Sequence, residues 1–205
     1  FDELNSSSLT LPLKLGRGKG GGEVNPNEAV IRTIAGLFDI PQGLVDEVWN
    51  QFEGVEHRLE KFFAENGIEY VNDSKCTTPA SLAWALEKFP DSKVILIAGG
   101  HPKSDDFDTV REWIRRKVKL GVIMGEARPL LRRAWQDLRP LWETDDFHAA
   151  VRMAQQNAKT GDIVLLSPAC ASFDMFQNYE ERGNLFKQIV REIAASKNSA
   201  HFSDV

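Results

Sequence analysis

The chain has 205 residues, of which 42% are hydrophobic and 27% charged, and its formal net charge is −5 at pH 7. This size suits one globular domain, or one domain with part of another. The negative charge argues against a nucleic-acid-binding protein that works by neutralising phosphates. No apolar run is long enough to span a membrane and nothing at Phe1 resembles a signal peptide, so we expect neither.

The first 25 residues predict little regular structure. Residues 9–14 alternate weakly between apolar and polar types, which favours one short strand. The glycine-rich run 16–22 invites comparison with a phosphate-binding loop. However, Lys19 is followed by Gly20 instead of Ser or Thr, and no buried strand precedes the run. A flexible connector is therefore the favoured interpretation.

Two helices are predicted between residues 25 and 52. Asn25 and Pro26 are typical of an N-cap and a first helical position, and Pro41 separates the first helix from the second. The residues expected to face inward are Ala29, Val30, Ile31, Ile34 and Leu37 in the first helix, and Leu44, Val45, Val48 and Trp49 in the second.

From Arg58 onward, predicted strands and helices alternate. Asn66-Gly67, between two strand-like runs, predicts a hairpin. The repeated β-α units predict an α/β fold, namely a Rossmann-like, mainly parallel sheet with helices on both faces. The strands are expected at 60–64, 68–71, 94–98, 120–124, 141–142 and 163–166, and the apolar helix faces at 82–89, 107–118, 130–138, 147–158 and 185–193.

Several polar residues are expected to cap helices or to form local pairs. Thr77 or Thr78 would cap the helix that Pro79 begins. The remaining assignments are Asp105 and Asp106 as caps of the helix from Phe107, Thr144 or Asp145 as the cap of the helix from Phe147, Ser172 as the cap of a helix from Phe173, and Arg182 as the local partner of Glu180 or Glu181.

Three polar turns follow predicted strands at their carboxyl ends. These ends share one edge of a doubly wound sheet, so the turns are expected to converge there. The residues they bring together are Asp73, Lys75, Thr77, Lys103 and Ser172. Two ammonium groups, two hydroxyls and helix N-termini suit carboxylates or phosphates. The alternative for the first turn is a simple cap cluster, although Asp73 and Lys75 exceed what a cap requires.

The two cysteines, Cys76 and Cys170, lie in two of these turns without a CxxC pairing. We expect neither a disulfide framework nor a zinc site, and no other metal site is assigned. This cysteine usage is typical of a reducing cytosol, so a cytoplasmic location is expected.

These turns carry a resemblance to the Mur ligase family, most closely to its D-glutamate-adding members. The run 72–77, Asn-Asp-Ser-Lys-Cys-Thr, resembles NDSKAT, with Cys76 in place of alanine. Residues 98–107 resemble GGxxKxxDF. Residues 165–183 resemble LLSPACASxDxFxxFxxRG, with Tyr179 in place of the last phenylalanine. The three matches occur in order and cover about Arg58 to Phe186. Residues 54–60 also resemble the family's G-x-x-HR-x-E.

The resemblance implies that residues 57–205 form the C-terminal glutamate ligase domain, and residues 1–56 the connector and the tail of the central ATP-binding domain. It implies part of an ATP-dependent, ADP-forming amide ligase of peptidoglycan precursor synthesis. Such an enzyme adds D-glutamate to UDP-N-acetylmuramoyl-L-alanine through an acyl phosphate. ATP and Mg²⁺ are the implied cofactors, bound mostly by the central domain.

The resemblance also implies roles for single residues. Thr77, Lys103 and Ser172 would hold the glutamate carboxylates, helped by the backbone at Tyr179. Arg58 and Lys75 would act on phosphates or developing charge, and the alternative for Arg58 is a surface pair with Glu56 or Glu60. The nucleotide contacts are Arg58, Asp73 at the ribose and Asn27 at adenine, although Glu23 and Val24 stand where His and Asn are usual.

No GK[ST] triplet occurs in the chain, so the P-loop is missing and the N-terminal and central domains are implied elsewhere. We expect the chain alone not to turn over ATP. Two alternatives stay open: a related Mur or folylpolyglutamate-type ligase with another amino acid, and a non-catalytic binding module of the same fold.

Overall fold

The computed structural model describes residues 26–52, 54–104 and 106–201. The chain divides into two compact units, with the boundary between residues 53 and 54, and each unit is described by itself. The short strand expected at 9–14, the glycine-rich run 16–22 and the cap at Asn25 lie outside the described residues.

The first unit is a pair of helices, α1 (Pro26–Leu37) and α2 (Gln42–Gln51), as predicted. Arg32 joins them, because its guanidinium contacts Glu28 of α1 and lies 2.7 Å from the carboxylate of Asp46 in α2. The expected inward faces are largely wrong. Two short helices offer each other only one contact face, so Val45 is buried while the following members of the predicted set are exposed: Val30, Ile31, Ile34, Leu37, Leu44 and Val48.

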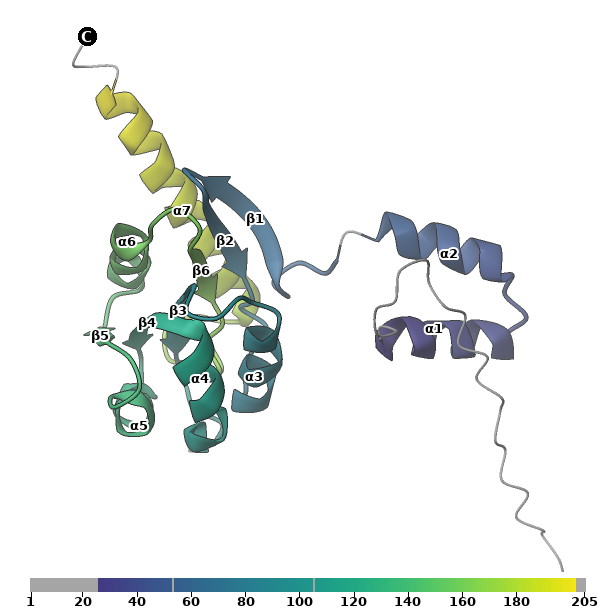
Figure 1. Cartoon of the computed structure of the whole chain (residues 1–205), viewed down its shortest axis with the longest axis horizontal. Coiled ribbons are helices and arrows are strands. Elements are labelled where there is room, and N and C mark those ends of the chain that lie inside the picture. The colour runs from purple at the N-terminus through teal and green to yellow at the C-terminus, as the bar shows by residue number, and fades with distance from the viewer. Residues whose placement is uncertain (1–25, 53, 105, 202–205) are drawn as a thin grey trace, which may run out of the picture. The chain divides into compact units, whose positions relative to one another are not determined.

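The second unit is built on one six-stranded sheet (Figure 1). The strand order is β1-β2-β6-β3-β4-β5, and every neighbouring pair is parallel except the antiparallel pair β1 and β2. The hairpin turn at Asn66 and Gly67 has positive φ at both residues, 52° and 73°, as an Asn-Gly turn requires. The strands are β1 (Glu60–Glu65), β2 (Ile68–Asn72), β3 (Val94–Gly99), β4 (Val118–Met124), β5 (Leu141–Thr144) and β6 (Ile163–Leu166).

Helices cover both faces of this sheet, which confirms the predicted fold class (Figure 1). Side chains alternate along β3, so Leu96 packs on one face and Ile95 and Ile97 on the other. The first face carries α3 (Pro79–Glu87), the 3₁₀ helix η1 (Phe107–Val110), α4 (Arg111–Lys117) and α5 (Arg128–Trp135); the second carries α6 (Phe147–Asn157) and α7 (Tyr179–His201).

Several element boundaries differ from the prediction. Val118 begins β4 instead of ending a helix, because it opens a β-branched and aliphatic run. Leu138 lies beyond the end of α5. Asp146 caps α6, with its carboxylate accepting from the His148 N–H at 2.9 Å, so the predicted caps Thr144 and Asp145 are wrong.

The caps at the site were partly predicted. Thr78 caps α3, and its hydroxyl accepts from the Ser81 N–H at 3.3 Å, with Pro79 next in the chain. The predicted cap at Ser172 is wrong because no helix begins at Phe173, and α7 starts six residues later. Asp106 precedes η1, but its side chain makes no capping hydrogen bond.

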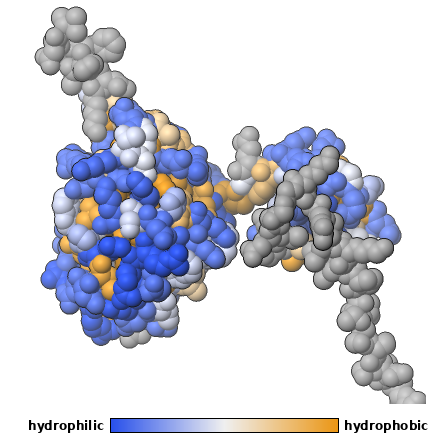
Figure 2. All heavy atoms as spheres, viewed as in Figure 1, coloured by the Kyte–Doolittle hydropathy of each residue, from blue (hydrophilic) through white to orange (hydrophobic). Residues whose placement is uncertain are grey.

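The surface of the second unit is mainly hydrophilic in the view of Figure 2. Each helix in the described part of the chain is either too short or too polar to cross a lipid bilayer.

Candidate functional site

The three polar turns meet at one edge of the sheet, as predicted. The first turn follows β2, the second follows β3 and the third follows β6. In the sheet, β6 lies between β2 and β3 and is parallel to both, so the carboxyl ends of these strands lie side by side. Backbone hydrogen bonds tie the turns together. The Gly99 N–H donates to the Pro168 carbonyl at 2.9 Å, and His101 and Ala171 exchange two bonds of 3.0 and 2.9 Å. The site therefore rests on main-chain pairing that continues beyond the strands.

Lys103 and Thr77 are brought together from two of these turns. The Lys103 ammonium donates to the Thr77 hydroxyl at 3.2 Å, although 26 residues separate them in the chain. Lys103 is exposed and Thr77 half-buried, so both groups can face a ligand from solvent. An ammonium beside a hydroxyl is a suitable pair of donors for a carboxylate.

Ser172 lies in the third turn and is buried. Its carbonyl accepts from the N–H groups of Met175 and Phe176 at 3.1 and 2.8 Å, which closes the turn without a helix. The next residue, Phe173, is exposed over 70% of its surface.

Lys75 of the first turn contacts Tyr179, the first residue of α7. The Lys75 ammonium lies 5.0 Å from the centre of the Tyr179 ring, within the range of a cation–π interaction. The Tyr179 carbonyl accepts from the Ser74 hydroxyl at 2.8 Å. The backbone at Tyr179 is thus directed toward the first turn and is held by it.

Asp73 is more enclosed than the sequence indicated. One carboxylate oxygen accepts from the Leu59 N–H at 3.2 Å, and the other accepts from the Ser167 hydroxyl at 2.8 Å. Burial raises the pKa of Asp73 to about 6, although these hydrogen bonds and the charge of Arg58 oppose the rise. A carboxylate oxygen can accept more than one hydrogen bond, so a ligand hydroxyl remains compatible with this arrangement.

Arg58 is exposed and lies between two residues with left-handed backbone, His57 with φ of 62° and Leu59 with φ of 45°. Such conformations are uncommon for residues other than glycine and often mark functional segments. The segment is held by its neighbours, since the Lys75 N–H donates to the His57 carbonyl at 3.0 Å. This bond ties the Arg58 segment to the first polar turn.

His57 is a buried support for that segment. The Asn72 amide donates to its Nδ1 at 2.9 Å, and its ring packs edge-on against Tyr179. Gly183 of α7 allows this packing, because a Cβ there would lie 2.2 Å from the same nitrogen. In the sequence, the only sign of these contacts was the Arg-Gly pair at 182–183.

Arg182 corrects the prediction of a local pair with Glu180 or Glu181. It is fully buried and turned into the site. Its guanidinium donates to the Ser74 hydroxyl and carbonyl at 3.0 and 2.8 Å, and to the carbonyls of Cys170 and Ala171 at 3.2 Å each. Sequence reasoning missed this residue, although its place in the third motif was a usable signal.

Glu56, His57 and Glu60 are the one group in the described part of the chain that gathers three possible metal ligands. The Lys187 ammonium donates to the carboxylates of Glu56 and Glu60 at 2.5 and 3.0 Å. An ammonium thus occupies the place between the two acids, and Lys187, not Arg58, is their partner. The group is better described as an ion-pair network than as a metal site.

The charged side chains at this edge of the sheet are mainly cationic, so they suit a phosphate better than they suit Mg²⁺. Arg58, Lys75 and Lys103 offer cationic donors, whereas both oxygens of Asp73 already accept protein hydrogen bonds. Mg²⁺ prefers carboxylate and phosphate oxygens in near-octahedral arrangement. The described residues at this edge therefore suit anionic groups such as phosphates and carboxylates better than a divalent cation.

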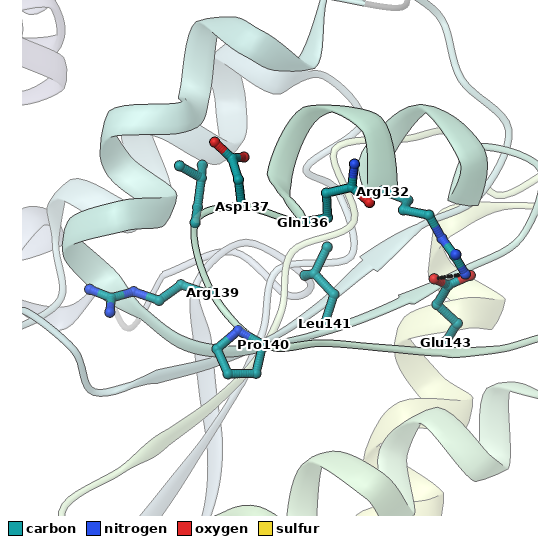
Figure 3. A pocket seen from close by; sticks show the side chains of 8 residues that line it. Arg132, Gln136, Asp137, Arg139, Pro140, Leu141 and Glu143 are labelled. Carbon is teal, nitrogen blue, oxygen red and sulfur yellow. Dashed lines mark ion pairs between the residues drawn. The ribbon is translucent and has the colours of Figure 1, made fainter.

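A separate hollow of about 470 Å³ lies beside the loop that leads into β5 (Figure 3). Arg132 and Glu143 form an ion pair across it, and Asp137 also pairs with Arg111. The loop enters β5 at its amino end, away from the edge where the three turns meet. None of the candidate site residues lines this hollow.

Comparisons with known proteins agree with this geometry. Residues 57–170 match the family described as Mur ligase, glutamate ligase domain. The UDP-N-acetylmuramoylalanine–D-glutamate ligase of Aquifex aeolicus is 43% identical over 162 residues, which cover 77% of this chain and 39% of the relative. The ligase of the same name from Chloroherpeton thalassium is 41% identical over 167 residues, 82% of this chain and 36% of the relative. The chain thus spans about two fifths of the length of these curated relatives.

Solved structures share the fold at low sequence identity. The UDP-N-acetylmuramoylalanyl-D-glutamyl-2,6-diaminopimelate–D-alanyl-D-alanyl ligase of Acinetobacter baumannii has a TM-score of 0.57 at 12% identity, over 80% of this chain and 36% of that one. Escherichia coli FolC, solved with ADP and without folate substrate, has a TM-score of 0.55 at 16% identity, over 86% of this chain and 40% of that one. With the family match over more than half of its length, the chain belongs to the Mur ligase family, through the glutamate ligase domain.

Proposed function

We propose that this chain is the amino-acid-binding part of an ATP-dependent, ADP-forming ligase that adds D-glutamate to UDP-N-acetylmuramoyl-L-alanine. The observation that carries the proposal is the meeting of Lys103 and Thr77, 3.2 Å apart, beside the turn that holds Ser172. The names of the relatives at 41–43% identity support the choice of amino acid. We assign residues 57–205 to this domain and residues 1–56 to the connector and the tail of the central domain.

In this proposal the three turns recognise the anionic amino acid. Lys103, Thr77 and Ser172 bind its carboxylates, and the backbone at Tyr179 completes the site. The supporting observations are the exposed Lys103 ammonium and the half-buried Thr77 hydroxyl, which lie 3.2 Å apart. A fixed set of donors for two carboxylates would align the substrate amine for attack.

The nucleotide would lie along the Arg58 side of the same edge. Arg58 and Lys75 stabilise the phosphates and the charge that develops when the amine attacks an acyl phosphate and phosphate leaves. Asp73 contacts the ribose and Asn27, in α1, contacts adenine. ATP supplies the activating phosphoryl group together with Mg²⁺, whose ligands we place mostly in the central domain of the longer protein. We propose a cytoplasmic location for this reaction.

Titration of the chain with D-glutamate, L-glutamate and ADP, followed by amide NMR, tests the proposal. We expect D-glutamate to shift the signals of Thr77, Lys103 and Ser172 and L-glutamate to shift them less. ADP is expected to shift the signals of Arg58 and Lys75. A preference for another amino acid would move the chain to another branch of the family, and the absence of shifts up to millimolar ligand would contradict a preformed site.

A further inference from the structure

Arg182 lies where the three turns of the site meet. Its Nη2 donates to the Ser74 carbonyl at 2.8 Å in the first turn, and its Nη1 and Nη2 donate to the carbonyls of Ala171 and Cys170 in the third. One rigid, planar group thus spans the turn that carries Lys75 and Thr77 and the turn that carries Ser172.

The second turn also packs directly on this guanidinium. Gly100 has a φ of 132°, and a Cβ built there would lie 3.2 Å from the Arg182 Nη1 and 2.3 Å from the Ala171 carbonyl. The chain that leads to Lys103 therefore passes close to Arg182, and the Ala171 carbonyl and the positive φ leave room only for a glycine at this position. The start of α7 at Tyr179 is linked to Arg182 as well. The Ser74 hydroxyl accepts from the Arg182 Nε and donates to the Tyr179 carbonyl.

Arg182 has no direct ion-pair partner in the described part of the chain, and the Asp174 carboxylate acts on its charge only through space. The four hydrogen-bond acceptors of Arg182 are a hydroxyl and three backbone carbonyls. Burial lowers the pKa of Arg182 to about 10, so the group keeps its charge at neutral pH. A buried cation without a paired anion is costly in free energy, which calls for a reason other than stability.

We infer that Arg182 is a positioning residue that sets the spacing between the Thr77, Lys103 and Ser172 turns and adds positive potential beneath them. A longer or shorter spacing would misplace the donors for the two carboxylates, and loss of the charge would weaken the attraction of an anionic amino acid. The part of this inference that concerns the amino acid rests on the proposed function. The part that concerns the spacing of the turns rests on the contacts of Arg182 alone.

The experiment compares Arg182→Lys and Arg182→Met with Arg191→Met, all in the full chain. Arg191 lies on the same helix, is exposed and contacts the ring of Phe62, away from the three turns. Amide hydrogen exchange is measured at Cys76, His101 and Ala171, whose N–H groups bond within or between the turns. D-Glutamate binding is measured on the same samples by amide NMR.

We expect exchange at these three amides to rise at least tenfold in both Arg182 variants, while the amides of β3 and β4 keep their wild-type rates. Lysine retains the charge and not the planar fork, so it should not restore the slow exchange and should recover only the part of the affinity that depends on charge. The affinity for D-glutamate should fall at least tenfold in Arg182→Met, and Arg191→Met should change neither quantity.

Unchanged exchange at the three amides in a folded Arg182 variant would overturn the inference. A uniform rise across the sheet would overturn it too, since that would show a role in general stability. If Arg182→Met does not fold, Ser74→Ala decides, because it removes the hydroxyl link and leaves the arginine in place. A wild-type chain that fails to bind D-glutamate would contradict the proposed function, while the exchange result still decides whether Arg182 sets the spacing.

Discussion

The Lys103 ammonium and the Thr77 hydroxyl, 3.2 Å apart, join two turns that follow different strands of the sheet. Replacing Lys103 by methionine keeps much of the side-chain volume and removes the charge. A hydrogen bond to a charged group contributes about 1.5–3 kcal/mol, so we expect D-glutamate binding to weaken about 10- to 100-fold. The affinity is measured by NMR titration.

Lys93→Met is the matched control for Lys103→Met. Lys93 is also exposed, but it precedes β3 and so lies at the opposite end of the strand. We expect its loss to leave D-glutamate binding unchanged. Equal losses in both variants would indicate a general effect of net charge and would count against a specific carboxylate contact at Lys103.

Gly183→Ala is expected to destabilise the second unit, against the usual preference for alanine in helices. Alanine normally improves a helix by about 1 kcal/mol over glycine. Here the added Cβ would lie 2.2 Å from the His57 Nδ1, and such overpacking costs about 1–3 kcal/mol. Urea unfolding of the second unit measures the net loss.

Two further variants separate packing from helix propensity at Gly183. Adding His57→Ala to Gly183→Ala removes the clash. The free energy of unfolding lost in the double variant should therefore be smaller than the sum of the losses in the two single variants. Gly36→Ala in α1, where an added Cβ meets nothing within 4 Å, should leave the unfolding of the second unit unchanged. Strict additivity in the double variant would show that the His57 ring does not cause the loss.

Asp73 should make the free energy of unfolding fall as pH rises from about 4 to about 6. Burial raises the pKa of this carboxyl from 3.8 to about 6, so the folded chain keeps a proton that the unfolded chain releases in that window. The unfolded state then binds fewer protons, and stability decreases as pH rises. The expected cost of the ionised group above pH 6 is about 3 kcal/mol.

Asp73→Asn tests this dependence, because the amide cannot ionise. Urea unfolding at several pH values should show the variant gaining stability relative to wild type between pH 4 and 6, with a constant difference above that. Asp108→Asn, at an exposed carboxylate, serves as the control. A difference between wild type and Asp73→Asn that does not change with pH would contradict a raised pKa at Asp73.

The convergence of the three turns could be predicted from the sequence because it follows from local patterns and one topological rule. Apolar runs such as 94–98 identify strands, and parallel neighbours place their carboxyl ends at one edge. The Asn66-Gly67 turn and the Thr78 cap were likewise local signals. Each of these features depends on residues that are close together in the chain.

The contacts of Arg182 and His57 could not be predicted in that way. Arg182 reaches Ser74 across 108 positions, and a local ion pair with Glu181 explains an Arg near a helix start equally well from sequence. The prediction of an inward apolar face for α1 failed for a related reason. Helical periodicity shows that a face exists, but it does not show whether another segment covers it.

Lys187 should stabilise the start of the second unit through its contacts with Glu56 and Glu60, and mainly when Glu60 is ionised. Burial alone would raise the pKa of Glu60, but the His57 N–H and the Lys187 ammonium outweigh it, and the pKa lies below its ordinary value. A lowered pKa gives stability that is present above pH 4.5 and is lost as pH falls through the folded pKa. We therefore expect Lys187→Met to cost about 1–3 kcal/mol at pH 7 and clearly less at pH 3.

The control for Lys187→Met is Lys61→Met, because Lys61 pairs with Glu69 at 2.8 Å on the exposed side of the hairpin. The Lys187 side chain is 10% exposed, whereas that of Lys61 is 65% exposed, and exposed pairs contribute little to stability. Urea unfolding of both variants at pH 7 and pH 3 makes the comparison. Equal losses for Lys187→Met at the two pH values would mean that the aliphatic part of Lys187 stabilises the fold by packing. A loss confined to pH 7 would mean that its charge holds the segment bearing Arg58 against α7.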